Sequence, residues 1–214
     1  MNQKISIELV NSIAEDISSM LRDLGEVGFD AILNEGIGRD IPFFNTFHDL
    51  CKIGVTMQQI LFIKKIEDFL RELSNVSPEK RRKFVEEIEK NPQKKRIFGE
   101  FLLLQIDRAD SLEKPSILGR LLKHHILENI SYDDAMRLSF IVDRVYMSDL
   151  NYLTSFTFGI QSNPNIAASL QSAGLLNLAG MDSGNLDEPS SGGVFYELND
   201  YGKMLLQYGL DSAV

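Results

Sequence analysis

The chain of 214 residues is 43% apolar and 25% charged, which suffices for one large domain or two small ones with a buried core. This composition excludes collagen-like, low-complexity and wholly disordered chains. With a net charge of −9, the chain as a whole should repel nucleic acid and anionic lipid. With one cysteine and no cleavable apolar signal, we expect a cytoplasmic protein without disulfides or structural zinc.

The charge is unevenly distributed. Residues 1–40 hold three basic and eight acidic residues, residues 41–150 hold eighteen and seventeen, and residues 151–214 hold one and six. The two ends are therefore acidic and the middle is nearly neutral. The mixing of both signs in the middle is typical of the solvated faces of amphipathic helices.

The first apolar pattern runs from Ile5 to Leu24 in steps of three and four residues, which predicts one amphipathic helix ending at Gly25. A short helix is expected over 27–33, and Gly36 and Gly38 indicate a linker.

A second helical period extends from Phe43 to Leu73, and Gly54 is a point where it could divide into two helices. Its longest uncharged run has eleven residues, whereas a bilayer span needs about twenty. We therefore expect a buried core helix. A membrane-surface helix with Lys64 and Lys65 at one end is the alternative.

Four further helices are predicted between residues 77 and 150. Ser77-Pro78 has the residue types of a helix start, and that helix should end near Asn91-Pro92. The segment 95–108 is rich in large apolar residues and is expected to be the most buried element. A helix over 112–127 follows, and a variant capping box at 131–134 opens the last one. The apolar face of this last helix is predicted to comprise Met136, Leu138, Phe140, Ile141, Val145 and Tyr146.

The tail has a different character. It predicts short helices at 149–158 and 165–173, strands at 175–178 and 194–198 separated by a Gly- and Ser-rich loop, and a helix over 200–210. This order fits a winged helix-turn-helix with the loop as the wing. The predicted fold class is mainly α, with amphipathic helices over 1–40, a helical bundle over 41–150 and a winged-helix-like domain with a small β-hairpin over 151–214.

Residues for metal or nucleophilic chemistry are scarce. The adjacent His124 and His125 point about 100° apart on a helix and cannot chelate as an i, i+4 pair does. His48 and Cys51 are expected to be ordinary helix residues. Acidic residues such as Asp107 should face solvent or pair with arginines. We predict no catalytic, cofactor-binding or metal-binding residues, and thus no enzyme.

The expected wing domain is poorly suited to DNA. Its candidate recognition helix over 165–173 contains no Lys or Arg, whereas DNA-binding modules depend on cations that contact phosphates. We expect a module for contacts with protein, through a partner or self-association, and no nucleic acid partner.

Basic residues that could contact an anion or lipid headgroup all lie in the middle segment. Most of the run that begins at Lys80 is balanced by glutamates one turn later, which favours pairing within the helix. The candidate contacts are Lys64, Lys65, Lys80, Arg81, Arg82, Lys83, Lys94, Lys95 and Arg96.

Several motifs between residues 40 and 152 resemble the abortive-infection alpha group of bacterial helical proteins. They include Ile41-Pro42, Leu61-Phe62-Ile63-Lys64-Lys65-Ile66, Ser77-Pro78-Glu79-Lys80-Arg81, Gly99-Glu100 and Ile117-Leu118-Gly119-Arg120-Leu121. The resemblance implies a helical protein linked to phage resistance and brings no catalytic residues with it. The leading hypothesis is thus a non-enzymatic phage-defence protein that acts through protein contacts. The alternatives are a membrane-surface effector that inserts its 43–73 helix and a winged-helix transcriptional regulator.

Overall fold

The computed structural model describes residues 3–27, 43, 46, 56–158, 163–182 and 193–210. These residues are mainly helical, with a small two-stranded antiparallel sheet, as the sequence predicts. The chain divides into two compact units, Met1–Ser131 and Tyr132–Val214, here called the N-terminal and C-terminal units. The predicted boundary near residue 150 falls within the second unit because the helix before it contacts the tail: Arg137 lies over the ring of Tyr201.

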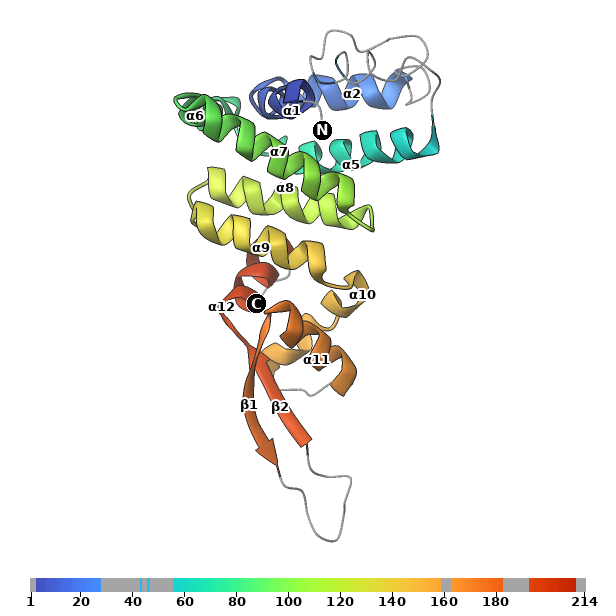
Figure 1. The fold of residues 1–214 in the computed structure, drawn as a ribbon, viewed down its shortest axis with the longest axis vertical. Helices are drawn as coiled ribbons and strands as arrows, with labels where there is room; N and C mark the ends of the chain where they lie inside the picture. The colour runs from blue at the N-terminus through green and yellow to red at the C-terminus, as the bar shows by residue number, and fades with distance from the viewer. Residues whose placement is uncertain are drawn as a thin grey trace. The chain divides into compact units, whose positions relative to one another are not determined.

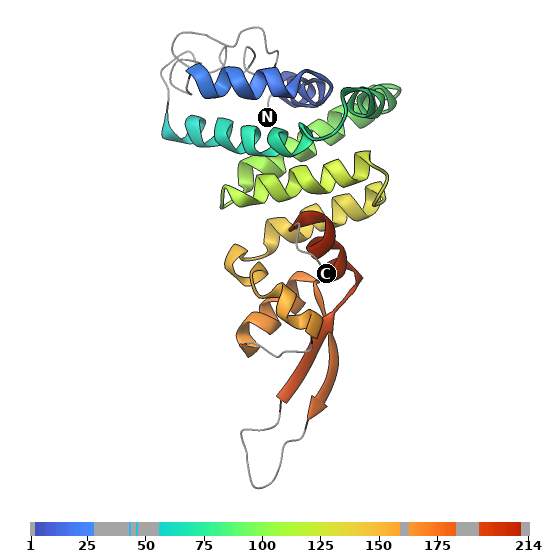
Figure 2. The ribbon, with the colours of Figure 1, turned by 180° about the vertical axis from the view of Figure 1, so that it is seen from behind.

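The N-terminal unit is built from helices that cross one another in layers (Figure 1). Its helices are α1 (Gln3–Ala14), α2 (Ile17–Val27), α5 (Met57–Leu73), α6 (Pro78–Glu89), α7 (Pro92–Arg108) and α8 (Glu113–Ile126). Helix α5 packs on α8, and α1 packs on α6 and α7. The first of these pairs can be followed from both sides in Figures 1 and 2. The core is formed by aliphatic and aromatic side chains that include Leu9, Ile13, Ile63, Ile66, Phe69, Leu70, Ile106 and Leu121.

Helix starts in this unit follow from local chemistry. Thr56 and Gln59 form a capping box at α5, in which each side chain bonds the other residue's backbone N–H, at 3.3 and 2.8 Å. Ser77 caps α6 and Asn91 caps α7, and each is followed by a proline at the first helical position. Helix α7 consequently begins at residue 92, three residues before the predicted start.

The prediction of one N-terminal helix ending at Gly25 is wrong. The chain forms α1 and α2 with a break between them, and α2 continues past Gly25 to Val27. The break occurs because the Asp16 carboxylate accepts the backbone N–H of Ser19 at 3.1 Å, which starts a new helix. The predicted helix over 27–33, the linker glycines, the possible division at Gly54, His48 and Cys51 lie outside the described residues, except that Val27 ends α2.

The prediction that residues 95–108 form the most buried element is also wrong. Phe98, Leu102 and Ile106 are buried against the rest of the unit, but Ile97 and Leu104 on the opposite side of α7 are 52% and 39% exposed. The segment is apolar on two faces, and only one of them is covered.

Helix α5 carries two partly buried carboxylates, Glu67 and Asp68. Burial raises the pKa of Glu67, while its ion pair with Arg71 acts in the opposite direction. Burial likewise raises the pKa of Asp68, with Arg71 again opposing the shift. Both groups bind protons more tightly in the folded chain than in the unfolded chain, so the free energy of unfolding should fall as the pH rises through their raised pKa values.

The direction of this pH dependence can be tested with Glu67→Gln, because a glutamine side chain does not titrate. The stability of the variant relative to wild type is expected to increase as the pH rises from about 4 to about 7, because only wild type must ionise this partly buried group. Urea titrations across this range would measure the difference. Glu86→Gln, at an exposed position of α6, is the reference variant. A relative stability of Glu67→Gln that decreases with pH contradicts the expectation.

The C-terminal unit contains α9 (Tyr132–Arg144), α10 (Met147–Leu150), the 3-10 helix η1 (Leu153–Phe158), α11 (Pro164–Ala173), β1 (Leu176–Asp182), β2 (Gly193–Leu198), α12 (Asp200–Met204) and the wide helical turn η2 (Leu205–Gly209). Figures 1 and 2 show the two strands as a long hairpin. The predicted helix over 165–173 and both strands are confirmed, although β1 extends four residues into the predicted loop. The predicted helix over 149–158 is instead divided into α10 and η1.

The predicted apolar face of α9 is wrong at two positions. Phe140 and Tyr146 are exposed, whereas Ala135, Ser139 and Val142 are buried with the correctly predicted part of the face. Ser139 is accommodated because its hydroxyl donates to the Ala135 carbonyl at 2.8 Å. A small hydroxyl that bonds its own helix can therefore occupy a core position that sequence patterning gives to a large aromatic residue.

The base of the hairpin is closed by Asn199. Its backbone N–H donates to the Leu175 carbonyl at 3.2 Å and its side-chain amide donates to the Gly174 carbonyl at 2.8 Å. Its side-chain oxygen also accepts the N–H of Gly202 and so caps α12. Gly174 ends α11 in the left-handed conformation, with φ of 91°, which favours glycine. One side chain thus joins α11, the hairpin and α12.

Candidate functional site

The nine basic candidates lie in three runs on three different helices, α5, α6 and α7. On α5, Lys64 is exposed and Lys65 is half-buried. The Lys65 ammonium donates to the carbonyl of Asp107 on α7 at 2.9 Å. This bond joins two helices, which gives Lys65 a structural role in addition to its charge.

The run on α6 divides between surface and interior. Lys80, Arg82 and Lys83 are exposed, but Arg81 is only 2% exposed. Arg81 is therefore removed from the set of surface contacts predicted from the sequence. A run of four consecutive residues on a helix spans all its faces, so one member had to point inward.

The buried Arg81 guanidinium holds three backbone carbonyls. Its Nε donates to Val76 at 3.1 Å, and Nη1 donates to Ile13 and Glu15 at 2.6 Å each. Burial lowers the pKa of Arg81, while the negative charge of Asp16 opposes the shift. Arg81 thereby joins the connection between α1 and α2 to the start of α6.

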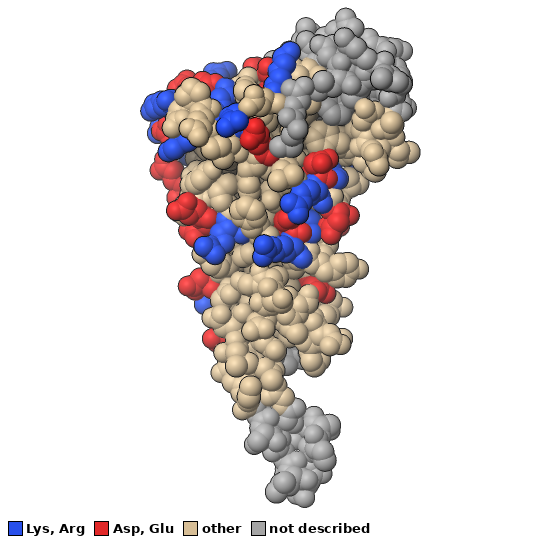
Figure 3. Space-filling view, in the orientation of Figure 1, with Lys and Arg blue, Asp and Glu red and all other residues tan. Residues whose placement is uncertain are grey.

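The run at the start of α7 is partly neutralised. Lys95 donates to the side-chain oxygen of Asn11 at 2.6 Å and forms an ion pair with Glu89. Arg96 lies 4.0 Å from Glu100. Lys94 is exposed. Within the described residues, the predicted candidates do not converge into one basic patch, and Figure 3 shows blue and red side chains intermingled in the upper part of the face that it draws.

A small pocket between α6 and α8 does bring two of the candidates together. It has a volume of about 160 Å³ and is lined by Lys80, Lys83, Phe84, Glu87, His125, Ile126 and Glu128. The His125 ring packs edge to face on Phe84 with 5.7 Å between centroids, and its Nδ1 lies 3.2 Å from the Ile130 carbonyl. Two carboxylates accompany the two ammonium groups, so the charges in this pocket nearly cancel and the pocket is poorly suited to binding an anion.

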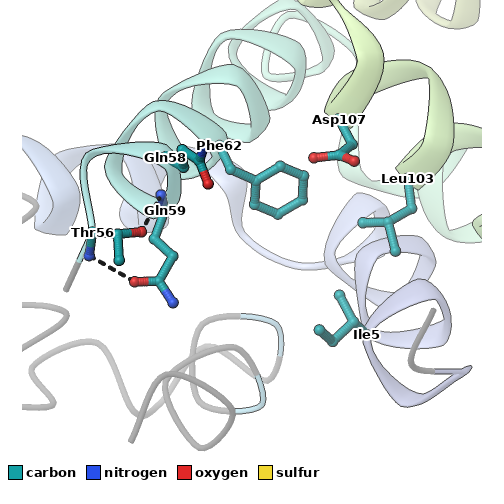
Figure 4. A pocket seen from close by; sticks show the side chains of 7 residues that line it. All are labelled: Ile5, Thr56, Gln58, Gln59, Phe62, Leu103 and Asp107. Atoms are coloured by element: carbon teal, nitrogen blue, oxygen red, sulfur yellow. Dashed lines mark hydrogen bonds between the residues drawn. The ribbon is translucent and has the colours of Figure 1, made fainter. Parts of the chain in front are cut away.

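A larger pocket opens between α1, α5 and α7 (Figure 4). Its volume is about 360 Å³, and its lining is Ile5, Thr56, Gln58, Gln59, Phe62, Leu103 and Asp107. The Phe62 ring and the two aliphatic side chains form apolar walls, and the Thr56–Gln59 capping box lies at one side. This lining suits an apolar group with a hydrogen-bonding end.

The C-terminal unit has a wide groove of about 940 Å³, lined by Asp133, Asp134, Met136, Arg137, Phe140, Ile141, Arg144, Ala173, Gly174, Asn199 and Tyr201. The Arg137 guanidinium lies over the Tyr201 ring, 5.5 Å from its centroid. Both signs of charge line this groove, so it favours neither an anion nor a cation.

The hairpin presents a continuous apolar face. The antiparallel register pairs Leu176 with Leu198, Leu178 with Tyr196 and Met181 with Val194. Because β2 is regular and its side chains alternate, the members of these three pairs all point to one side of the sheet. We call these six residues the hairpin face. The irregularity in the register at Ala179 places Met181 on the same side of the sheet as Leu176 and Leu178.

Exposure increases along this face from the base of the hairpin toward its tip. Leu176 and Leu198 are buried, Leu178 is 50% exposed and Met181 is 76% exposed. None of the six side chains is charged, and only Tyr196 carries a hydroxyl group that could donate a hydrogen bond. Exposed apolar side chains grouped in this way are characteristic of a surface that contacts another protein or a membrane. Sequence reasoning assigned residues 179–182 to a loop and missed this face, although the alternation in 194–198 was a signal for its β2 half.

Two further properties of the described residues concern metal binding and membrane crossing. No group of three or more His, Cys, Asp or Glu side chains there could hold a metal ion. The two histidines of α8 bond locally, His124 to the Asn129 amide at 2.8 Å and His125 near the Ile130 carbonyl. Within the described ranges, every helix falls short of the length and apolar character that a membrane crossing requires.

Comparisons with protein-family models, with curated proteins and with solved structures returned no match to this chain.

Proposed function

We propose that this chain is a non-enzymatic, protein-binding component of bacterial phage defence. The observation that carries its mode of action is the hairpin face, whose exposed end is apolar and uncharged. Burial of exposed apolar area is the main driving force of protein association, whereas phosphate recognition needs cations. The link to phage defence comes from the resemblance of the segment 40–152 to the abortive-infection alpha group.

Within this proposal, the C-terminal unit is a winged-helix module adapted to protein contact. The order α11, β1, β2, α12 is that of a winged helix, and Asn199 holds these elements together at the hairpin base. Helix α11, in the place of a recognition helix, contains no Lys or Arg. A transcriptional regulator is thus the weaker assignment.

Phage infection tests the proposed function. Expression of the full chain in a phage-sensitive bacterial host is expected to lower plaque counts for at least one phage, and Met181→Asp is expected to restore them. The charge opposes apolar docking at a position where it should not disturb folding. Gln207→Asp, also at an exposed position of this unit, is the matched control. Unchanged plaquing by wild type across a broad phage panel contradicts the proposal.

A membrane-surface effector is the second candidate, because Met57 and Leu61 are exposed on α5 near Lys64. Co-sedimentation with vesicles containing anionic phospholipid distinguishes the two assignments. Binding that is lost in Leu61→Glu and retained in Met181→Asp would favour the membrane; a protein-binding component should remain in the supernatant.

A further inference from the structure

The outer side of α7 carries a second, unexplained apolar stripe. Lys94, Ile97, Phe101, Leu104 and Arg108 follow one another at steps of three, four, three and four residues. These steps keep all five side chains on one side of the helix, and we call them the α7 seam. The three apolar members lie in the middle, and a cation lies at each end.

The α7 seam is exposed in the folded chain. Ile97 and Leu104 are among the most exposed large apolar residues of the N-terminal unit, Phe101 is half-buried, and Lys94 and Arg108 are exposed. The opposite side of α7 already forms core contacts through buried residues such as Phe98, Leu102 and Ile106. Apolar side chains on both sides of a helix are normally buried on both sides, so the exposed Ile97 and Leu104 mark this side of α7 as a candidate contact surface.

The spacing identifies the shape of that partner. Alternating steps of three and four residues form the narrow seam by which two helices pack at a shallow angle. From Lys94 to Arg108 the seam is about 21 Å long, at a rise of about 1.5 Å per residue. A single amphipathic helix of about four turns or more covers a strip of these dimensions.

Charge decides which helix fits. A second copy packed on the seam would place Lys94 against Arg108 when antiparallel, or each cation against its equivalent when parallel, and both arrangements bring like charges together. A bilayer also fits poorly, because Glu100 and Asp107 border the seam on one side and an anionic surface would repel them. A helix with apolar residues in the middle and carboxylates at both ends matches the seam.

We propose that the α7 seam is a docking site for an amphipathic helix of another protein, with Asp or Glu residues flanking its apolar stripe. This inference deepens the proposed protein-binding function and rests on it. It adds a second contact surface, on the other compact unit, with a defined partner chemistry. Apolar contact with Ile97, Phe101 and Leu104 supplies affinity, and the two end cations fix the register.

Two synthetic helical peptides test this docking directly. Both have Leu and Ile at the seam-facing positions of about three heptads; one carries Glu in its terminal heptads and the other carries Lys. Fluorescence anisotropy with the full chain is expected to show the Glu-ended peptide bound about tenfold more tightly than the Lys-ended one. Absence of binding by both peptides, or equal binding, overturns the proposal.

Variants of the chain assign the binding to the seam. Leu104→Glu is expected to weaken binding of the Glu-ended peptide about tenfold or more, whereas Leu61→Glu, an equally exposed leucine on α5, should leave it unchanged. The double variant Lys94→Glu with Arg108→Glu should invert the preference between the peptides. Circular dichroism and thermal unfolding confirm that each variant is folded. Equal losses in Leu104→Glu and Leu61→Glu would overturn the assignment.

The result separates this inference from the phage-defence proposal. A chain that lowers plaque counts but binds neither peptide disproves the seam and leaves phage defence intact. A chain that binds the Glu-ended peptide through Leu104 but leaves plaquing unchanged does the reverse. If Leu104→Glu removes binding to anionic vesicles and has no effect on the peptides, the seam is a lipid contact and the proposal is wrong.

Discussion

Replacement of Arg81 by methionine is expected to lower the free energy of unfolding by about 3 to 5 kcal/mol. The side chain donates to the carbonyls of Ile13, Glu15 and Val76 and is 2% exposed, so its removal leaves several polar groups without their charged donor. Leaving a buried polar group unsatisfied costs about 1 to 3 kcal/mol. Methionine has a similar reach and fills much of the space, so the loss arises from hydrogen bonds more than from a cavity.

The neighbouring residue provides the control. Arg82→Met removes the same charge one position along α6, but Arg82 is exposed, so the change in unfolding free energy should stay within about 0.5 kcal/mol. Urea titration followed by helical circular dichroism measures both variants. Amide hydrogen exchange should locate the loss of protection in Arg81→Met to the end of α1 and the start of α6. Equal effects of the two substitutions would show that the buried bonds contribute nothing.

Arg81 also illustrates what the sequence could and could not predict about the site. Its place three residues before Phe84 puts both on one side of α6, so the inward direction was available from helical spacing. Its acceptors were not, because Ile13 and Glu15 lie more than sixty residues away and become neighbours only after folding. A basic run was therefore predicted as a surface feature when one of its members is part of the interior.

Helix boundaries were predictable where a cap and a proline occur together. Ser77-Pro78 marks the start of α6 as expected, because both residue types act within one turn. The break between α1 and α2 was missed because Ile13 and Ile17 remain in phase across it, so apolar spacing alone reads as one helix. Asp16 ends the continuity of the helix by capping α2, but the apolar residues before and after it keep the spacing of one helix.

The two exposed apolar surfaces were hidden from the sequence for different reasons. On the hairpin, the irregularity at Ala179 shifts the phase of β1, and a strict alternation would have placed Met181 on the other face. On α7, apolar residues occur on both sides, and apolar content alone predicts burial whether or not a partner lies within the same chain. In both cases the geometry, and not the composition, distinguishes core from contact surface.

Gly99→Ala is expected to lower the free energy of unfolding by about 1 to 3 kcal/mol, although alanine normally stabilises a helix interior relative to glycine by about 1 kcal/mol. A Cβ at Gly99 would lie 2.3 Å from the carbonyl oxygen and 2.8 Å from the carbonyl carbon of Ser6. Both atoms belong to the backbone of α1, which cannot rotate away as a side chain does. Helices α1 and α7 would have to separate, and the buried Val10, whose Cγ2 would lie 3.1 Å from the added Cβ, would pack less closely.

Unfolding experiments decide whether Gly99→Ala lowers or raises the free energy of unfolding. Gly180→Ala in β1 is the control, because nothing lies within 4 Å of its Cβ position, and it should be neutral or stabilising. Gly119→Ala should resemble Gly99→Ala, since its Cβ would lie 2.5 Å from the Phe69 carbonyl oxygen where α8 crosses α5. Thermal and urea unfolding measure all three. A Gly99→Ala variant more stable than wild type would mean that α1 and α7 do not pack backbone to backbone. The outward direction of the α7 seam depends on that contact, because it fixes which side of α7 faces the core.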